Sequence, residues 1–267
     1  MENYVHGYTE REARRLQDQA VTLADLLHRD VRFPAGSRVL EAGCGTGSQT
    51  VLLARNNPDS RFVSIDVSRR SLLQAEEAVR AAGLTNVRFE QADIFGLPFA
   101  EEAFDQVFVC FVLEHLADPA AALCCLRRVL KKGREMTVVE GDHGSFYCHP
   151  ETSAARRTVD CLVEVQAQLG GNALIGRQLY PLLRASGFRR PQVTPRLVYV
   201  DGSRPELIEG FSHRTFIAMV QGVRDQACSR GLIDQAAWDR GIDDLKAAAA
   251  PGGTFSYTFF QALATKS

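Results

Sequence analysis

One stretch near the start of the chain constrains the fold more than any other: residues 38–49 read R-V-L-E-A-G-C-G-T-G-S-Q. The apolar pair Val39 and Leu40 predicts a short buried strand of a parallel sheet. Three glycines then follow at alternating positions, Gly43, Gly45 and Gly47. Because glycine has no Cβ, these positions let the backbone turn sharply and approach a ligand closely. Ser48 is a good N-cap, so we expect a helix from Gln49.

The acidic residue before the glycines indicates which ligand this loop binds. Free amides at a helix N-terminus suit a phosphate or a carboxylate. The Glu41 carboxylate, at the tip of the strand, suits a cationic group instead. S-adenosylmethionine (SAM) satisfies both, because it carries an α-amino acid end and a sulfonium beside its adenosine. We therefore expect Glu41, the three glycines and Gln49 to bind SAM.

The stretch E-A-G-C-G-T-G resembles the first motif of class I SAM-dependent methyltransferases. Its spacing is G-x-G-x-G, whereas the rival dinucleotide-binding fingerprint is G-x-G-x-x-G. Asp66 and Val67 then follow a strand predicted over 61–65, where an acid hydrogen-bonds ribose hydroxyls in doubly wound folds. The alternative role for Asp66 is to cap the helix predicted over 69–82. The position favours a ribose contact, and the resemblance places Val67 beside it.

Two later segments extend the resemblance. The segment 92–99 resembles the family's third motif, which implies that Asp93 bonds the adenine amine and that Ile94 packs on the ring. From the residues alone, Asp93 is alternatively a turn cap. The ending F-D-Q-V-F-V-C-F-V-L-E-H-L resembles the ubiquinone, menaquinone and small-molecule branch, and it lacks the Asn/Asp-Pro-Pro-Tyr of DNA N6-adenine and protein-glutamine methyltransferases. This match implies that Cys110 and Phe111 lie near the amino acid end of SAM.

The residues before the sheet predict a lid. Apolar residues recur at helical spacing over 9–30, and Tyr4 and Tyr8 precede this helix. N-terminal helices often cover the SAM pocket in the resembled family, so we expect residues 1–32 to form a helical lid. Tyr4 from this lid and His115 from the L-E-H-L segment would then complete the SAM pocket. The alternative is a frayed terminus.

Strands and helices alternate from residue 38 to residue 140, which predicts an α/β fold with a doubly wound, mostly parallel sheet. The resemblance implies seven strands in a Rossmann-like class I methyltransferase fold, with an antiparallel last strand over 254–263. The SAM-binding domain is expected to span 33–267. Helical insertions are expected after strands five and six, at 144–175 and 203–252. Because the strand ends are occupied by SAM, we expect the insertions to recognise the acceptor.

The insertions carry an apolar and aromatic set that suits a small organic pocket: Phe146, Tyr147, Tyr180, Phe211, Phe216 and Met219. The alternative is that these side chains only pack the helices together. The second insertion is expected to contain two helices over 205–250, and the chain is expected to leave strand five as a loop over 141–147.

Methyl transfer from a sulfonium mainly needs position and a dry pocket, and it needs a base only if the nucleophile must lose a proton. The candidate catalytic residues are Glu140 and His143, at the end of strand five, together with Tyr8 and Tyr147. The alternatives are structural: an ion pair or a helix cap for Glu140, and a bond to a carbonyl for His143. The histidines and cysteines in this region lack zinc-ligand spacing, so no metal is expected.

Three function classes stay open from the sequence. The first is a SAM-dependent methyltransferase that acts on a small-molecule acceptor. The second is a SAM-using enzyme that closes the aminobutyrate arm of SAM into a ring and expels methylthioadenosine. The third is a non-catalytic, SAM-binding regulatory protein. The spent nucleoside separates them, because only the first class produces S-adenosylhomocysteine.

Composition narrows the partners and the compartment. The net charge is −1 and 24% of residues are charged, so no basic field invites nucleic acid. No run approaches the roughly 18 apolar residues of a spanning helix, and the polar N-terminus does not resemble a signal peptide. Seven cysteines without a C-x-x-C predict reduced thiols and a cytoplasmic location. Monomer and homodimer stay open.

Overall fold

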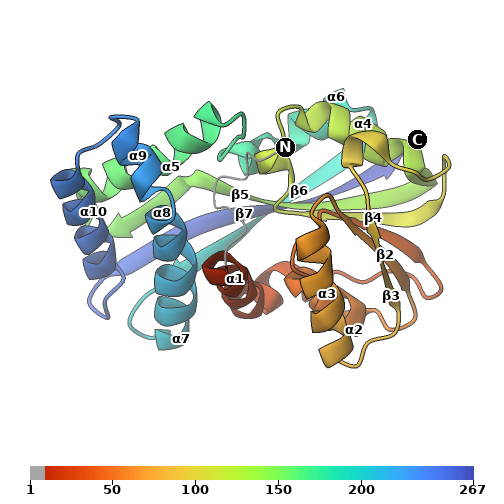
Figure 1. Ribbon diagram of the computed structural model, residues 1–267, viewed down its shortest axis with the longest axis horizontal. Helices are drawn as coiled ribbons and strands as arrows, with labels where there is room; N and C mark the ends of the chain where they lie inside the picture. The colour runs from red at the N-terminus through yellow and green to blue at the C-terminus, as the bar shows by residue number, and fades with distance from the viewer. Residues whose placement is uncertain (1–9) are drawn as a thin grey trace.

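The computed structural model describes residues 10–267, and its centre is one seven-stranded sheet (Figure 1). The strands are β1 (Arg38–Ala42), β2 (Arg61–Asp66), β3 (Val87–Gln91), β4 (Phe104–Cys110), β5 (Leu130–His149), β6 (Phe188–Val200) and β7 (Thr254–Lys266). Their order is β3-β2-β1-β4-β5-β7-β6. Strands β1 to β5 pair in parallel, and β7 runs antiparallel between β5 and β6. The predicted doubly wound, mostly parallel seven-stranded sheet is confirmed.

Helices cover both faces of this sheet. The α-helices are α1 (Glu10–His28), α2 (Ser48–Asn56), α3 (Arg69–Ala81), α4 (Pro119–Val129), α5 (Ser153–Gln168), α6 (Leu179–Ala185), α7 (Pro205–Leu207), α8 (Ala218–Gln221), α9 (Arg224–Ser229) and α10 (Gln235–Ala248). Three short 3₁₀ turns and one π-helix complete the set: η1 (Ile94–Gly96), η2 (Leu113–His115), η3 (Ile175–Gln178) and the π-helix η4 (Ile208–Ile217). Side-chain caps start several helices, as where the Ser68 hydroxyl accepts a hydrogen bond from the Ser71 amide before α3.

Two apolar cores lie on the two faces of the sheet. On one face, Leu123 and Leu126 of α4 and Leu179 and Leu183 of α6 are fully buried against the strands. On the other face, α1 and α2 pack with the helices that follow β6, and Trp238 of α10 is buried in that core. Figure 1 shows α4 and α6 above the sheet and α2 and α3 below it. Because both faces of the sheet are packed against helices, the strand ends are held in fixed positions.

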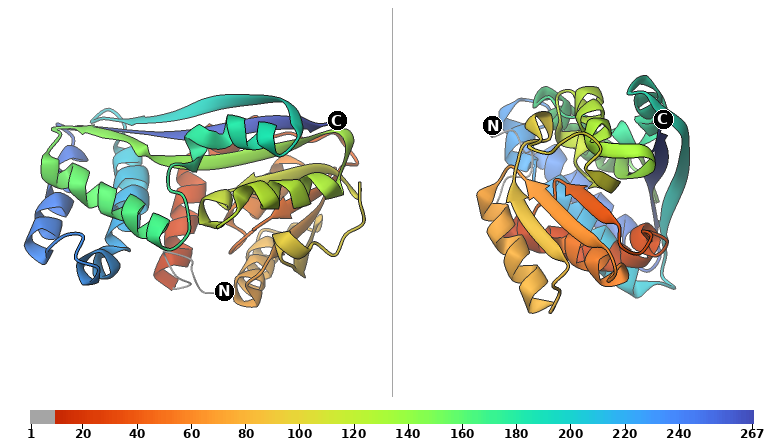
Figure 2. Two further views of the ribbon diagram at one scale, coloured as in Figure 1. Left: turned by 90° about the horizontal axis from the view of Figure 1, so that it is seen from above. Right: turned by 90° about the vertical axis from the view of Figure 1, so that its right-hand side faces the viewer.

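The fifth strand is much longer than the sequence predicts. Instead of ending at Glu140 and entering a loop, β5 continues to His149 because β7 supplies it with an antiparallel partner as far as Thr254. The predicted loop over 141–147 is therefore wrong, and the segment is a bulged strand. Figure 2, left, shows β5, β6 and β7 running along the length of the molecule.

The segment after β6 also differs from the prediction of two helices. It forms one helical run from Pro205 to Gln221, which includes η4, and then the separate helices α9 and α10. Gly231, with a φ of +69°, follows α9 and separates it from α10, because this left-handed backbone conformation ends a helix at little cost for glycine. Between residues 10 and 267, no helix is both long and apolar enough to cross a membrane.

Candidate functional site

The three glycines between β1 and α2 have different physical roles, although all three have a positive φ. A Cβ on Gly43 would lie 2.5 Å from Val112 Cγ2, and one on Gly47 would lie 2.8 Å from Ala75 Cα. These two glycines therefore allow close packing within the protein. A Cβ on Gly45 would meet no protein atom within 4 Å. Gly45 is the glycine of this loop that borders open space.

Asp66 holds the glycine loop against the end of β2. Its Oδ2 accepts a hydrogen bond from the Gly45 amide at 2.9 Å, and its Oδ1 accepts one from the Ser68 amide at 2.8 Å. The carboxylate thus caps the turn before α3 and braces the loop at once. Burial raises the pKa of Asp66, although the bonds from Ser68 and Gly45 oppose the shift.

Glu41 is a buried carboxyl inside β1. The Ser64 hydroxyl donates a hydrogen bond to its Oε2 at 2.6 Å. Burial raises the pKa of Glu41 to about 7, against hydrogen bonds from Ser64 and Thr50 that favour the charged form. A positive charge beside Glu41 would stabilise its ionised form and lower this raised pKa, so the site is suited to a cationic group.

Other predicted ligand residues have protein partners or lie at the surface. Gln49 Oε1 is hydrogen-bonded to Nε2 of His28, so it ties α2 to α1. Asp93 accepts a hydrogen bond from the Phe95 amide at 2.9 Å, which makes it a turn cap in this structure. Ile94 is buried, whereas Val67 is 40% exposed.

Glu140 shapes the loop after β4. It is fully buried, and its Oε1 accepts hydrogen bonds from the Val112 amide at 3.0 Å and the Leu113 amide at 2.8 Å. Burial raises the pKa of Glu140 well above its usual range, and the charge of Glu114 adds to this effect. Nearby, Cys110 is buried, and Phe111 has a φ of +57°, which turns the chain toward η2. Among the candidate bases, Glu140 therefore has a structural role, because it fixes the backbone after β4.

An irregular bulge in β5 aims His143 at β7. Asp142 pairs with Thr258 and Tyr147 pairs with Ser256, so residues 143–146 lie opposite residue 257 alone. Bulges of this kind re-aim side chains and are frequent beside active sites. The His143 amide donates to the Ala173 carbonyl at 2.9 Å, which fixes the backbone of the bulge.

The bulge is anchored from its other side by an ion pair. Asp142 accepts two hydrogen bonds from Arg177, at 2.6 Å from Nε and 2.9 Å from Nη2. Ser145 also bridges the bulge, donating to the Asp142 carbonyl at 2.7 Å and accepting from the Thr258 amide at 2.9 Å. His143 is therefore presented by a rigid segment.

A cavity opens between α1, η4, the end of β4 and the segments of β5 and β7 around His143 and Tyr257. Its lining combines aromatic and apolar side chains with polar ones: Arg15, Leu16, Gln19, Phe111, Glu114, His115, Gly141, His143, Phe211, Thr215, Phe216, Met219, Tyr257 and Phe259. Phe111, at the end of β4, contacts Phe259 with 5.5 Å between ring centres. This combination of an aromatic wall and a polar end suits a small organic molecule with a polar reactive group.

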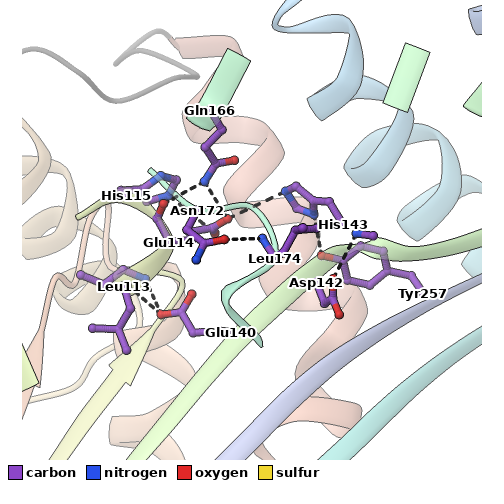
Figure 3. Close-up of polar contacts among 12 residues, drawn as sticks. Leu113, Glu114, His115, Glu140, Asp142, His143, Gln166, Asn172, Leu174 and Tyr257 are labelled. Carbon is purple, nitrogen blue, oxygen red and sulfur yellow. Dashed lines mark hydrogen bonds and ion pairs between the residues drawn. The ribbon is translucent and has the colours of Figure 1, made fainter. Parts of the chain in front are cut away.

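Glu114, His143 and Tyr257 form the polar end of the cavity, and Gln166 contacts Glu114, which completes a polar cluster of four residues (Figure 3). His143 Nδ1 lies 2.7 Å from the Tyr257 hydroxyl, and its Nε2 lies 3.8 Å from Glu114 Oε2. Glu114 Oε1 lies 3.6 Å from His115 Nε2. The Gln166 amide donates to Glu114 Oε2 at 3.2 Å. Within the described part of the chain, no group of His, Cys, Asp and Glu is placed to hold a metal ion.

The structure brings together only part of the predicted catalytic set. His143 and His115 reach the cavity, together with Phe211, Phe216 and Met219 of the predicted aromatic set. Phe146 is buried and stacks on Phe216 at 5.1 Å, whereas Tyr147 and Tyr180 are 55% and 54% exposed at the surface. Tyr147 does not line the cavity, because it lies beyond the bulge. Tyr4 and Tyr8 lie outside the described residues.

Among the residues of the cavity that sequence reasoning missed are four with polar or charged side chains: Arg15, Gln19, Glu114 and Tyr257. Arg15 and Gln19 are polar residues on the apolar stripe of α1, and both are at least 92% buried. Glu114 stands in the E-H-L segment, whose histidine alone was assigned. Tyr257 stands in the last strand, T-F-S-Y-T-F-F, as a lone hydroxyl among inward-facing aromatics. A polar residue within an apolar pattern was the available signal in three of these cases.

Comparison with known proteins identifies the family. A family model described as a methyltransferase domain matches residues 34–186. The 27-O-demethylrifamycin SV methyltransferase of Amycolatopsis mediterranei is 28% identical over 61% of this chain and 58% of its own length. The chain spans about half the length of the curated relatives it matches.

Solved structures share the fold. A putative methyltransferase from Bacillus halodurans has a TM-score of 0.59 at 17% identity, covering 91% of this chain and 98% of its own. The [4+2]-cyclase SpnF has a TM-score of 0.54 at 23% identity, covering 95% and 81%. The chain therefore belongs to the methyltransferase-domain family and has the fold of class I SAM-dependent methyltransferases.

Proposed function

We propose that this protein transfers the methyl group of SAM to a small-molecule acceptor held in the cavity between α1, η4 and the segments of β5 and β7 around His143 and Tyr257. The observation that carries the proposal is the placement of this cavity. Phe111, at the end of the central strand β4, lines it, and this strand lies beside the strand that carries the glycine loop. A cavity beyond the carboxyl ends of the central strands is where ligands bind doubly wound sheets.

The residues present fit SAM. Gly45 borders open space, so a ligand can lie against its backbone, and Asp66 offers remaining lone pairs to a ribose hydroxyl. The buried Glu41 carboxyl, with a pKa of about 7, suits the positive charge of the SAM amino acid end or sulfonium. When bound, SAM would supply an activated methyl group on a sulfonium, which makes the displacement favourable.

The lining of the cavity supports an acceptor that is largely apolar with one polar reactive group. Phe211, Phe216 and Phe259 form aromatic walls, while His143 and Glu114 form the polar end. The relative named for 27-O-demethylrifamycin SV acts on a small molecule, which agrees with this chemistry. We propose no nucleic-acid partner. We also propose a cytoplasmic location, because the seven cysteines without a C-x-x-C predict reduced thiols.

His143 is the candidate from the sequence that handles the acceptor's proton. Burial lowers the pKa of His143, and the charges of Glu114 and Asp142 offset this only in part, so the imidazole is neutral at pH 7. The acceptor's oxygen or nitrogen attacks the methyl carbon, the carbon–sulfur bond breaks, and its electron pair goes to sulfur. The proton lost by the acceptor must then pass to a group in the cavity, and a neutral imidazole can take it.

The spent nucleoside tests the function directly. Purified protein is incubated with SAM, with and without cell extract as a source of acceptor, and the nucleoside products are identified by mass spectrometry. S-adenosylhomocysteine that depends on the extract supports methyl transfer. Methylthioadenosine without extract would instead support closure of the aminobutyrate arm. If neither nucleoside is formed, the result supports the regulatory class and overturns the proposal.

Replacing Asp66 with alanine should weaken SAM binding at least ~10-fold. The carboxylate's hydrogen bonds are charge-assisted, each contributing about 1.5–3 kcal/mol, and the variant also loses the brace on Gly45. Isothermal calorimetry with SAM measures the change. Asp59→Ala, at an exposed turn, is the matched control. Unchanged affinity in folded Asp66→Ala would remove Asp66 from the site.

We propose that α1 is part of a lid over the cavity, since Arg15, Leu16 and Gln19 line it and α1 packs against η4. Amide hydrogen exchange in α1 should slow when S-adenosylhomocysteine is added, because a bound ligand would hold the helix closed. Exchange in α10, which contributes no side chain to the cavity, serves as the internal reference. Equal protection of α1 in both states would make it ordinary structure.

A further inference from the structure

The hydroxyl of Tyr257 has a fixed place in the polar cluster. It lies 2.7 Å from His143 Nδ1 and packs against the backbone at Gly141, where an added Cβ would come within 2.4 Å of it. A phenol has one hydrogen to donate. His143 Nδ1 is the hydrogen-bond partner that the structure gives this hydroxyl, so the Tyr257 hydrogen can be donated to it. The tyrosine ring is held by Phe211 and Phe259, with ring centres 5.9 Å and 4.7 Å away.

The Tyr257 hydroxyl at Nδ1 and the Glu114 carboxylate beside Nε2 together favour one tautomer of His143. If Nδ1 accepts from Tyr257, the neutral imidazole carries its hydrogen on Nε2. Nε2 has no hydrogen-bond partner among the described residues, and the Glu114 carboxylate lies beside it at 3.8 Å. An N–H that faces a carboxylate is favourable, whereas a lone pair facing it is not. The carboxylate therefore supports the same tautomer from the other side.

Glu114 is held in place and ionised. The Gln166 amide donates to its Oε2 at 3.2 Å and to its carbonyl at 3.0 Å, and the Asn172 amide donates to the same carbonyl at 2.7 Å. Burial alone would raise the pKa of Glu114. The interactions of Glu114 with His115, His143, Gln166 and Arg15 together outweigh burial and lower its pKa.

We propose that Glu114, His143 and Tyr257 form a proton relay in which Tyr257 is the catalytic residue that meets the acceptor's hydroxyl. The inference rests on the proposed methyl transfer. Tyr257 and His143 both line the cavity, but Nδ1 of His143 is taken up by the Tyr257 hydroxyl and its Nε2 faces Glu114, so the Tyr257 hydroxyl is the group of the relay left to meet the acceptor. This is the order of a carboxylate, an imidazole and a hydroxyl in which the base is oriented by a third group. Glu114 is a positioning residue, since it acts through His143.

The relay moves one proton from the acceptor to His143 through Tyr257. The acceptor's oxygen forms a bond to the methyl carbon of SAM, and the carbon–sulfur bond breaks toward sulfur. The hydroxyl hydrogen of the acceptor passes to Tyr257 Oη while the hydrogen of Tyr257 passes to His143 Nδ1. The resulting imidazolium lies beside the Glu114 carboxylate and later loses one proton to water. Tyr257 ends each cycle as the neutral phenol, which agrees with burial raising its pKa well above 10.

The relay predicts a tautomer that can be measured without the acceptor. Protein labelled with ¹⁵N-histidine and loaded with S-adenosylhomocysteine is studied by long-range ¹H–¹⁵N NMR, and His143→Asn assigns the signal among the six histidines. We expect the hydrogen of neutral His143 on Nε2. A hydrogen on Nδ1 in the parent protein would overturn the relay, and this measurement needs no variant of Tyr257 or Glu114 to fold.

Titration of the same signal tests the role of Glu114. The charged groups that face His143 are Glu114 and Asp142, which raise its pKa, and His115 and Arg15, which lower it. Glu114→Gln removes the larger raising charge, so the pKa of His143 should fall by about one unit or more. Glu77→Gln, at an exposed position on α3, is the control. An unchanged titration in folded Glu114→Gln would remove Glu114 from the relay.

Turnover separates failure of the relay from failure of methyl transfer. Tyr257→Phe keeps the ring and removes the hydroxyl, so it should lower S-adenosylhomocysteine formation in cell extract by ~10-fold to ~100-fold, with SAM affinity unchanged. Tyr199→Phe, at an exposed position, is the control. Normal turnover in Tyr257→Phe would overturn the relay alone. No S-adenosylhomocysteine from the parent protein would instead overturn the proposed function.

Discussion

Gly45→Val should lose SAM binding almost completely, by more than ~10²-fold or about 2.7 kcal/mol. A β-branched side chain at a φ of +52° is strained, and its atoms would project into the open space beside the loop. Gly43 and Gly47 are less informative positions, since a Cβ there would strike Val112 or Ala75 and disturb the fold itself. Calorimetric titration with SAM measures the loss.

Gly36→Val provides the matched control for this experiment. Gly36 has a φ of +79°, is exposed, and also has no atom within 4 Å of an added Cβ, so it imposes similar backbone strain away from the site. Both variants should lose a comparable part of their unfolding free energy. Only Gly45→Val should lose SAM. Equal SAM affinity in the two variants would place the ligand somewhere other than the glycine loop.

His143→Ala should lower turnover by ~10²-fold or more while SAM affinity stays within a few-fold of the parent, which is the effect expected for loss of a general base. The side chain lines the cavity and is fully buried, and its removal leaves the Tyr257 hydroxyl without its imidazole partner. SAM affinity and S-adenosylhomocysteine formation are measured separately on the same preparation.

His149→Ala tests whether the effect is specific to the cavity. His149 lies on the same strand, β5, beyond the bulge and exposed to solvent. The His149→Ala variant should turn over normally. Normal turnover in His143→Ala would move the proton transfer to another residue.

Phe216→Ala should raise the acceptor concentration needed for half-maximal rate, since Phe216 lines the apolar wall.

The parallel half of the fold was predictable from the sequence because its signals are local. The run at Val39 and Leu40, the glycines after it and Asp66 at the next strand end each define one strand and one turn. The second half was harder, because β5 beyond Glu140 exists only through its pairing with β7, more than a hundred residues later. A strand that depends on a distant partner leaves little periodicity of its own.

The site divides along the same line. The glycine loop and Asp66 lie within 30 residues of one another, and the sequence places them together. The cavity joins Arg15, His143, Phe216 and Tyr257 from four distant segments. His143 was found because it follows a strand end, whereas Tyr257 is a ring in an aromatic strand until the bulge brings His143 to it. The tertiary structure, and not the local sequence, places the Tyr257 hydroxyl beside His143.

The π-helix η4 gives the cavity wall an unusual property. Its wider turn carries Phe211, Thr215 and Phe216 to the cavity while α1 packs along it, with Thr22 against Gly210. π-Helical turns are rare and frequently lie at functional sites. Deleting one residue within Ile208–Ile217 would favour the narrower α-helical winding and change which side chains of this segment face the cavity. A single-codon loss could thus replace one wall of the cavity and leave the sheet and the glycine loop untouched, so related chains can change acceptors through the length of this segment.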